Sequence, residues 1–434
     1  NVRAGMKAPV ATIGAVLPGD FKIKKGKLRG IESQGMLCGA SEIDLEDKID
    51  GLLELPADAP VGMNIREYLD LDDNVIDISI TPNRGDCFSI RGIAREIGVI
   101  NQLPVTAPEI KEVAATISDE KKVVVSTEGC PRYLGRVIKN VNTKAVTPVW
   151  MERALARSGI RQHSILVDIT NYVLMELGQP LHAFDGGKVQ GAVHVRQATE
   201  AEKLVLLNEQ EVELNEKVMV IADDEKALAI AGIMGGLSSA VSDATTEIFL
   251  ESAFFAPLHI AGRARSFGLH TDASQRYERG VDFELPLIAM HRASQLIAEL
   301  AGGEFGPITV AENAALLPTR DAIELNQAQV DQLLGYSVDS AFITDALSRL
   351  GCEVTVKAEG EWSVVPPSHR YDMVIYQDLI EEVARIHGYD NIQISLPVID
   401  VKLAKYQDQF ELGQLRQTAV TLGYQEAISF SFAD

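Results

Sequence analysis

Short apolar segments separated by turn residues open the chain. Val10–Val16 and Gly35–Gly39 are short enough to be strands, and Pro18–Asp20 carries the proline and glycine of a turn. The pattern predicts an all-β region over residues 1–65.

The periodicity then changes. Ile76–Ile80 alternates apolar and polar residues, which predicts a strand that Thr81–Asp86 breaks. Isoleucine or alanine at 90, 93, 94 and 97 has the spacing of an amphipathic helix, predicted over 89–100. Pro104 and Pro108 mark a linker, so we expect residues 66–120 to form a connecting domain of α+β type.

The remainder mixes strands with helices in an α+β, multidomain arrangement. A helix predicted over 291–301 is closed by Gly302 and Gly303, and a proline junction at Leu316–Thr319 separates two units. We expect a large mixed block over 121–310 and a smaller α+β unit over 318–393. Residues 394–434 then begin a domain that the chain does not finish, so we expect a fragment lacking both termini.

Charge restricts how this chain can contact nucleic acid. The formal net charge of −22 over 434 residues excludes a surface that is basic throughout. Any contact with phosphates must therefore be local or shared with a partner. The densest basic stretch offers Lys22, Lys24, Lys25 and Lys27. These lysines suit either a phosphate contact or an edge strand protected from aggregation.

Cysteine usage and hydropathy favour a cytoplasmic protein. The four cysteines are far apart in the sequence and form no Cys-x-x-Cys pair, which favours reduced thiols over disulfides or zinc. The longest apolar runs, such as Ala227–Met234, fall short of the roughly 20 residues that cross a bilayer, so we expect no membrane association.

Polar residues accumulate in three segments of the 121–310 block. In the first, His182 follows Pro180, so a rigid turn presents the imidazole; a hydrogen-bonded structural histidine is the alternative. In the second, Glu251 interrupts an apolar strand, where a carboxylate needs a partner or a function. In the third, Thr271–Ser274 suits either a site or a helix cap.

The absence of two kinds of known motif limits the reactions expected of this block. Its glycine-rich run Ile230–Gly236 fits neither nucleotide-binding pattern, and the chain has no Gly-x-Ser-x-Gly elbow. If the block hydrolyses a substrate, we expect it to position water beside a reactive ester rather than to form a covalent intermediate.

An acidic set lies further along the chain. Asp378, Glu381 and Glu382 are spaced to share one face of a helix predicted over 376–387, with Asp372 just ahead of it. Such oxygen ligands suit magnesium, but carboxylates at a helix start also complement the helix dipole. Both interpretations stay open on spacing alone.

Four motifs give the chain a resemblance to the bacterial phenylalanyl-tRNA synthetase beta subunits. They are TPNRGDCFS at 81–89, GQPLHAFD at 178–185, LHTDASQRYERG at 269–280 and PPSHRYD at 366–372. The resemblance covers essentially the whole chain. It implies a partial OB-fold, a β-barrel remnant that binds tRNA, at 1–65, and an editing module resembling domains B3 and B4 at 121–310. It also implies a B5-like domain at 318–393 and the start of an inactive catalytic-like domain at 394–434.

The resemblance further implies a hydrolytic site that clears tyrosine wrongly attached to tRNA(Phe). A hydrophobic pocket rejects an added hydroxyl only about a hundredfold, which explains the need for a second pocket. Glu251, helped by the backbone beside Gly235, would accept the tyrosine hydroxyl, and His182 and Thr271 would serve the ester and its water. The family's editing positions also match at Arg161, Pro180 and Ala273.

Partners and cofactors follow from the same resemblance. An alpha subunit would ligate phenylalanine to tRNA(Phe) with ATP in an (αβ)2 assembly, and Asp372, Asp378, Glu381 and Glu382 would share Mg2+ with it. A tRNA-binding scaffold without active editing is the main alternative, and a metal-dependent hydrolase built on the acidic helix is a third.

Overall fold

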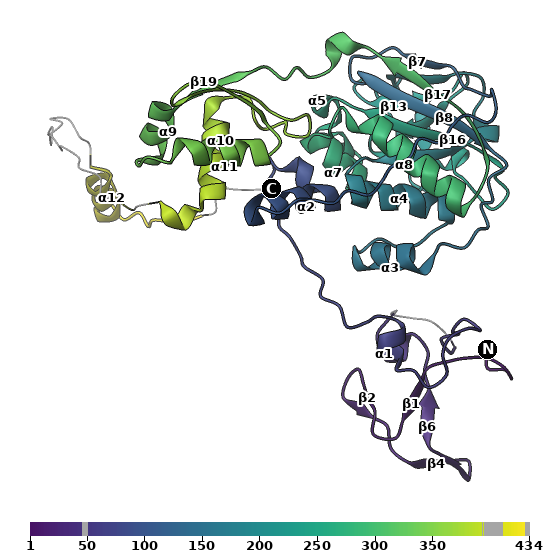
Figure 1. Ribbon diagram of the computed structural model, residues 1–434. Helices are drawn as coiled ribbons and strands as arrows, with labels where there is room; N and C mark the ends of the chain where they lie inside the picture. The colour runs from purple at the N-terminus through teal and green to yellow at the C-terminus, as the bar shows by residue number, and fades with distance from the viewer. Residues whose placement is uncertain (46–50, 393, 395–410, 430–434) are drawn as a thin grey trace.

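A computed structural model describes residues 1–45, 51–392, 394 and 411–429. It shows a mixed α/β chain of several units, which confirms the predicted multidomain α+β character. Figure 1 shows the N-terminal strands joined to the rest by an extended segment, and a small C-terminal unit beside a larger block.

The described residues of the N-terminal unit form six short strands, in agreement with the all-β prediction. They are β1 (Val10–Thr12), β2 (Val16–Leu17), β3 (Phe21–Lys22), β4 (Gly26–Leu28), β5 (Ile31–Ser33) and β6 (Gly35–Leu37), followed by η1 (Ser41–Ile43) and helix α1 (Ile65–Tyr68). The strands pair as three separate antiparallel ladders, β1 with β6, β2 with β3 and β4 with β5. Its buried apolar cluster is small, and the OB-fold assignment stays a prediction.

The strand predicted over Ile76–Ile80 is wrong. Residues 66–120, all of which the structure describes, contain no strand, and 71–80 run as extended chain. The alternating side chains are largely exposed, and Ile76 keeps 78% of its accessible surface. An extended segment without a neighbouring strand has no ladder of hydrogen bonds, so alternation alone does not make it part of a sheet. After η2 (Gly85–Cys87), the predicted amphipathic helix is present as α2 (Ile90–Asn101).

Two sheets form the large block. The first has the order β17-β8-β16-β9, all antiparallel, and the second the order β15-β14-β13-β10-β7. The strands are β7 (Val123–Val125), β8 (Arg132–Lys139), β9 (Leu181–Asp185), β10 (Val193–Gln197), β13 (Met219–Ala222), β14 (Ala227–Ile230), β15 (Met234–Gly235), β16 (Glu247–Phe254) and β17 (Glu304–Glu312). A hairpin of β11 (Lys203–Val205) and β12 (Glu211–Glu213) projects from it.

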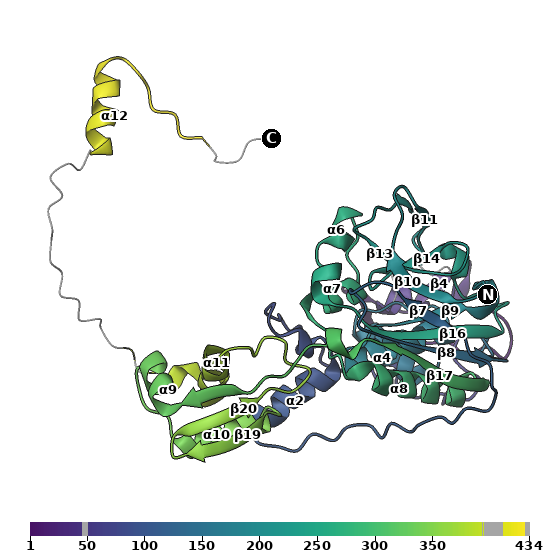
Figure 2. The ribbon, with the colours of Figure 1, turned by 90° about the horizontal axis from the view of Figure 1, so that it is seen from above.

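Helices complete the block. They are α3 (Val149–Arg157), α4 (Ile165–Leu177), α5 (Pro257–Ile260), α6 (Arg263–Ser266), α7 (Asp272–Arg279) and α8 (Leu285–Leu300), with short turns η3 (Gly186–Lys188), η4 (Leu237–Ser239) and η5 (Ala314–Leu316). Helices α4 and α8 cover one face of the four-stranded sheet, as Figure 2 also shows, and their apolar side chains join one buried cluster with that face.

The central strands of the four-stranded sheet are buried on both faces. Along β16, Phe249 and Ala253 join the cluster shared with the second sheet, whereas Ile248 and Leu250 join the cluster under α4 and α8. This is the period of two expected of a strand. Glu251 therefore lies on the same face as Phe249 and Ala253, between the two sheets.

The C-terminal unit packs three strands against helices. Its sheet has the order β18-β20-β19, and its elements are β18 (Ile323–Asn326), α9 (Gln327–Leu334), α10 (Ser340–Arg349), β19 (Glu353–Ala358), β20 (Glu361–Val365), α11 (Tyr376–His387) and η6 (Tyr389–Asn391). Trp362 is at the centre of this core, and its indole nitrogen donates to Thr344 Oγ1 at 2.8 Å. Val99 of α2 belongs to the same cluster, so α2 bridges the two units (Figure 2). Helix α12 (Leu412–Thr421) follows.

Gly135 of β8 offers a test of how closely the sheets pack. A Cβ at this position would lie 2.1 Å from Cζ of Phe249. We expect Gly135→Ala to lower the free energy of unfolding by about 1–3 kcal/mol, because overpacking forces neighbours out of their rotamers. The control is Gly26→Ala in β4, where a Cβ meets nothing within 4 Å. Denaturant unfolding would contradict the packing described here if both variants matched the parent chain.

Candidate functional site

A narrow cleft of about 80 Å³ lies where β9, β16 and α7 meet the segment 229–235. It brings together five of the residues singled out from the sequence: Pro180, His182, Gly235, Glu251 and Ala273. The other lining residues are Leu181, Ile221, Ala229, Ile230, Ala231, Gly232, Ile233, Met234 and Tyr277. The three polar segments of the sequence therefore contribute to one place.

Glu251 is a buried carboxyl group in a strand with neighbours on both sides. It lies opposite His182 of β9 and Gly135 of β8, and only 8% of its surface is exposed. Tyr133 donates its hydroxyl hydrogen to Oε2 at 2.9 Å. Burial raises the pKa of Glu251 to about 7, although the Tyr133 hydrogen bond acts in the opposite direction. Burial thus favours the protonated form of this carboxyl group.

His182 lies next to Glu251 in the register of the sheet. A Cβ on Gly235 would come within 2.5 Å of Cε1 of this imidazole, so only a glycine lets the ring approach the backbone there. Nε2 is buried and has no hydrogen-bond partner within the described ranges. Burial lowers the pKa of His182 to about 4, so the imidazole is neutral at physiological pH.

Thr271 supports the wall of the cleft without lining it. It is the N-cap of α7, where its hydroxyl oxygen accepts from the Ser274 amide at 3.1 Å. The same hydroxyl donates to the carbonyl of Ile233 at 2.9 Å. Thr271 therefore caps α7, as one interpretation of the sequence expected. It also lies beside the cleft, because its hydroxyl holds the loop of Ile233 that forms one wall.

Three buried side chains at the cleft were not anticipated from the sequence. Tyr133 supplies the hydrogen bond to Glu251, and Gln179 and Tyr277 both donate to the carbonyl of Ala253, at 2.8 Å and 3.0 Å. Tyr133 belongs to β8, which also carries Arg132, Arg136 and Lys139. The sequence could have indicated Tyr133 only indirectly, because a buried Glu251 needs a hydrogen-bond donor on a neighbouring strand.

Arg161 lies away from this cleft. It is exposed in the connection between α3 and α4, whereas Pro180 and His182 follow the other end of α4. The 13 residues of α4 separate those two ends by about 20 Å, at 1.5 Å per residue.

The basic stretch of the N-terminal unit is at the surface. Lys22, Lys24, Lys25 and Lys27 are all exposed, and Lys25 forms an ion pair with Glu32 at 3.2 Å. The strand β3 ends at Lys22, so the strand face expected to carry both Lys22 and Lys24 does not extend that far.

The acidic set at 372–382 does not converge on a common point for a metal ion. Both oxygens of Asp372 accept from Arg370, at 2.8 and 2.7 Å, and both oxygens of Glu382 accept from Arg370 and Arg385. Asp378 accepts from the amides of Val374 and Ile375, each at 2.8 Å, and Glu381 is exposed. The carboxylates that the spacing placed on one helix face thus serve ion pairs and a helix cap, and they do not fit a magnesium ion in this arrangement.

These ion pairs continue into the TPNRGDC motif. Arg84 donates to Asp86 at 3.0 Å and to Glu96 of α2 at 2.6 Å, and Arg385 of α11 donates to the other Glu96 oxygen at 2.5 Å. Asp86, Cys87 and Glu96 come close enough to hold a cation, but the guanidinium of Arg84 contacts all three. We refer to this set as the arginine–carboxylate lattice: Arg84, Asp86, Glu96, Arg370, Asp372, Glu382 and Arg385.

Comparison of the sequence with known proteins identifies the family of this chain. Family models match at 1–64 (putative tRNA binding domain), 129–302 (B3/4 domain) and 323–389 (tRNA synthetase B5 domain). The phenylalanine–tRNA ligase beta subunit of Acinetobacter baylyi is 79% identical over 434 residues, covering 100% of this chain and 55% of the relative. The chain belongs to the family of bacterial phenylalanine–tRNA ligase beta subunits.

Other members are similar over the same extent. The beta subunit of Idiomarina loihiensis is 54% identical over 436 residues and that of Psychrobacter arcticus 55% over 442, each covering 100% of this chain and 55% of the relative. The chain thus spans about half the length of the curated beta subunits it matches. A solved N-terminal beta-subunit fragment from Pyrococcus horikoshii covers 75% of this chain and 95% of that one, with 17% identity and a TM-score of 0.36, too low to support an argument.

In the described part of this beta subunit, no helix combines the length and the apolar character that spanning a membrane requires.

The lattice predicts that substitutions at two neighbouring glutamates change the free energy of unfolding by very different amounts. Glu382 is 1% exposed, and its pKa is lowered to about 2 because hydrogen bonds from Arg370 and Arg385 outweigh the effect of burial. We expect Glu382→Gln to cost about 3–5 kcal/mol of unfolding free energy, since it leaves guanidinium charge buried and uncompensated. Glu381→Gln, one residue earlier and exposed, is the control and should change little. Equal stability of both variants in denaturant unfolding would refute the lattice.

The raised pKa of Glu251 predicts a pH-dependent stability. Between about pH 4.5 and 7 the folded chain keeps a proton on Glu251 that the unfolded chain has lost, so the free energy of unfolding falls as pH rises through this window. Glu251→Gln is neutral throughout and should remove this loss, which amounts to about 3 kcal/mol at most. His182 contributes an opposite slope from about pH 4 to 6.5, but it is common to both proteins and cancels in the difference. Unfolding of both at pH 5 and pH 8 is the measurement; a constant difference between them would contradict the prediction.

Proposed function

We propose that this beta-subunit chain binds tRNA(Phe) and hydrolyses Tyr-tRNA(Phe) in the cleft around Glu251. The observation that carries the proposal is a buried carboxyl group with one oxygen held by Tyr133 and the other without a hydrogen-bond donor among the described residues. A tyrosine hydroxyl supplies that missing partner, whereas phenylalanine leaves the oxygen unpaired, and an unmade buried hydrogen bond is costly.

In the proposed reaction, water adds to the ester that joins tyrosine to the terminal ribose of the tRNA. A bond forms between the water oxygen and the carbonyl carbon, the bond to the ribose oxygen breaks, and that oxygen takes a proton. We assign His182 to orient the water, since a neutral imidazole can accept a hydrogen bond from it. Thr271 holds the loop of Ile233 in place, and Pro180, Gly235 and Ala273 shape the walls.

Arg161 has a different place in this proposal. Because it is exposed beyond the far end of α4, we assign it to the tRNA rather than to the amino acid. The exposed lysines Lys22, Lys24, Lys25 and Lys27 form a second contact with the RNA backbone, since they concentrate positive charge on a chain of net charge −22. This proposal also keeps the domain assignment made from the sequence, including an OB-fold over 1–65.

The whole beta subunit of this family suggests the wider setting. We infer a cytoplasmic (αβ)2 ligase in which the alpha subunit uses ATP and Mg2+ to attach phenylalanine to tRNA(Phe). No step in the present chain is assigned to magnesium, because guanidinium groups already bind the oxygens of Asp372 and Glu382.

One observation favours the scaffold as a second candidate. The cleft of about 80 Å³ is well below the roughly 300–1,000 Å³ of most ligand pockets. A tyrosyl group enters only if the wall formed by 229–235 moves. A chain in which this wall stays closed would bind tRNA without editing.

The deciding experiment incubates the chain with Tyr-tRNA(Phe) and Phe-tRNA(Phe) and follows release of each amino acid. We expect selective release of tyrosine, reduced at least about tenfold by Glu251→Ala, since a hydrogen bond to a charged group contributes about 1.5–3 kcal/mol. Glu247→Gln is the matched control, because Glu247 lies on the same strand but outside the cleft.

The other outcomes separate the candidates. Binding of tRNA with no release of either amino acid would support the scaffold. Release that survives Glu251→Ala but is lost with EDTA and with Asp378→Ala would support a metal-dependent hydrolase on α11.

A further inference from the structure

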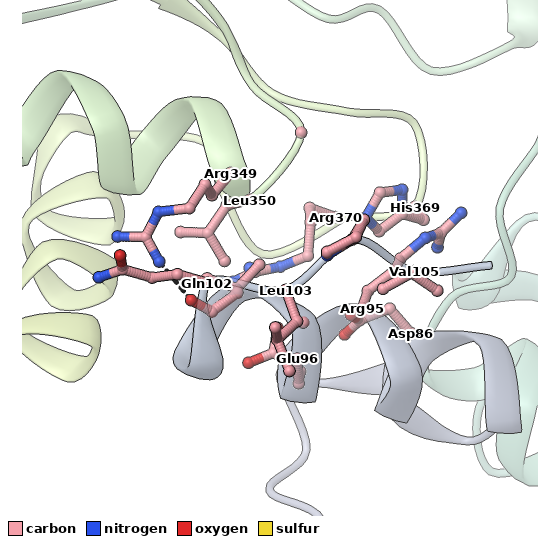
Figure 3. Close-up of a pocket in the computed structure, with 14 residues that line it drawn as sticks. Asp86, Arg95, Glu96, Gln102, Leu103, Val105, Arg349, Leu350, His369 and Arg370 are labelled. Atoms are coloured by element: carbon pink, nitrogen blue, oxygen red, sulfur yellow. Dashed lines mark hydrogen bonds between the residues drawn. The ribbon is translucent and has the colours of Figure 1, made fainter.

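A second cavity lies outside the editing cleft and shares no residue with it. It has a volume of about 490 Å³ and is enclosed by α2, the segment that follows it, the end of α10 and the PPSHR turn before Arg370. This volume falls within the range typical of small-molecule sites. Figure 3 shows Arg349, Leu350 and Gln102 at one end, Arg95, His369 and Val105 at the other, and Leu103 and Arg370 between them.

The acidic groups at this cavity are already compensated. Asp86 and Glu96 belong to the arginine–carboxylate lattice, where Arg84 binds both of them. Arg370 is likewise saturated by Asp372 and Glu382. The charges left to act on a ligand are therefore those of side chains outside the lattice.

Arg95 is the charged side chain of the cavity that has no ion-pair partner among the described residues. It is part-buried on α2, and it forms no ion pair or hydrogen bond with the residues that the structure describes. Arg91 lies one helical turn away on the same face and also has no ion pair within the described ranges, an arrangement that destabilises a helix. Burial, and then the charge of Arg91, lower the pKa of Arg95. The charges of Asp282 and Asp86 act in the opposite direction and raise this pKa, and both residues line the hollow that continues beyond Arg95.

Two further groups indicate that the cavity is suited to an anion. Nη2 of Arg349 is buried without a partner in the described chain, although its other nitrogens bind Asp345 and the carbonyl of Val99. Burial and the charge of Arg95 lower the pKa of His369 to about 3, so its imidazole is neutral and can donate a hydrogen bond without adding charge. The remaining wall is apolar, from Val99, Leu103, Val105 and Leu350.

We propose that this cavity binds a small phosphomonoester with an apolar or aromatic body, its phosphate on Arg95 and His369 and its body against Leu103 and Leu350. A dianion supplies the counter-charge that Arg95 and Arg91 lack. The apolar body of the ligand removes the apolar wall of the cavity from water, whereas inorganic phosphate would leave that wall hydrated. Arginine suits the phosphate because its donors match two oxygens at once.

Phenyl phosphate is the probe, and calorimetric titration of the 434-residue chain is the measurement. We expect it to bind at least tenfold more tightly than inorganic phosphate, and phenol alone to bind more weakly still. Arg95→Gln should weaken phenyl phosphate at least tenfold, and Arg95→Lys by less, because it keeps the charge. Arg29→Gln, which removes an equal charge from an exposed site in the N-terminal unit, should have no effect.

A second variant keeps the test independent of folding defects. Val105 is 44% exposed beside Arg95, so Val105→Glu places a carboxylate at the proposed phosphate position without disturbing a core. It should abolish phenyl phosphate binding and raise the melting temperature. Three results would overturn the proposal: no binding at millimolar phenyl phosphate, equal weakening by Arg29→Gln and Arg95→Gln, or equal affinity for inorganic phosphate. None of these depends on whether the chain releases tyrosine.

Discussion

Burial of the four-stranded sheet on both faces is the constraint on which the rest of this structure depends. Because β16 has neighbours on either side and apolar layers above and below, every side chain from Ile248 to Phe254 must be accommodated by the interior. Glu251 keeps only 8% of its accessible surface there, so it needs a hydrogen-bond donor from the protein, and Tyr133 is that donor. The same burial raises the pKa of Glu251 and lowers that of His182, so that burial disfavours the charged form of both neighbouring groups.

Much of the architecture could be predicted from periodicity. The helix expected over 89–100 is present as Ile90–Asn101, and the helix expected over 376–387 is present with those bounds, because each has an apolar stripe at helical spacing. The strand expected at Ile76–Ile80 failed because alternation reports which side chains can share a face, not whether a partner strand exists. Pairing depends on segments distant in the sequence, which periodicity does not show.

The candidate site was predictable where its residues broke a local rule. Glu251 in an apolar strand and Gly235 after one were visible as exceptions, and both line the cleft. Tyr133 was invisible, since a tyrosine in a buried strand breaks no rule. The spacing of Asp378, Glu381 and Glu382 correctly predicted a helix, but spacing does not show which groups the carboxylates bind. Glu382 pairs with Arg370 and Arg385, which are also near in sequence.

The arginine–carboxylate lattice has a mechanical consequence for the chain as a whole. It joins α2 to α11 through charges removed from water, where dissolved ions screen poorly. Helix α2 and the C-terminal unit should therefore turn as one piece, because shearing them apart would expose several unmatched charges together. The ties of the extended residues 71–80 are more exposed: Asp73 pairs with Arg157 of α3 at 2.9 Å, and the Ile80 carbonyl accepts from Arg279 at 3.4 Å. Any swing of the N-terminal strands about this segment would first have to break the exposed pairs of Arg157 with Asp70 and Asp73, which water and salt screen far more than the lattice.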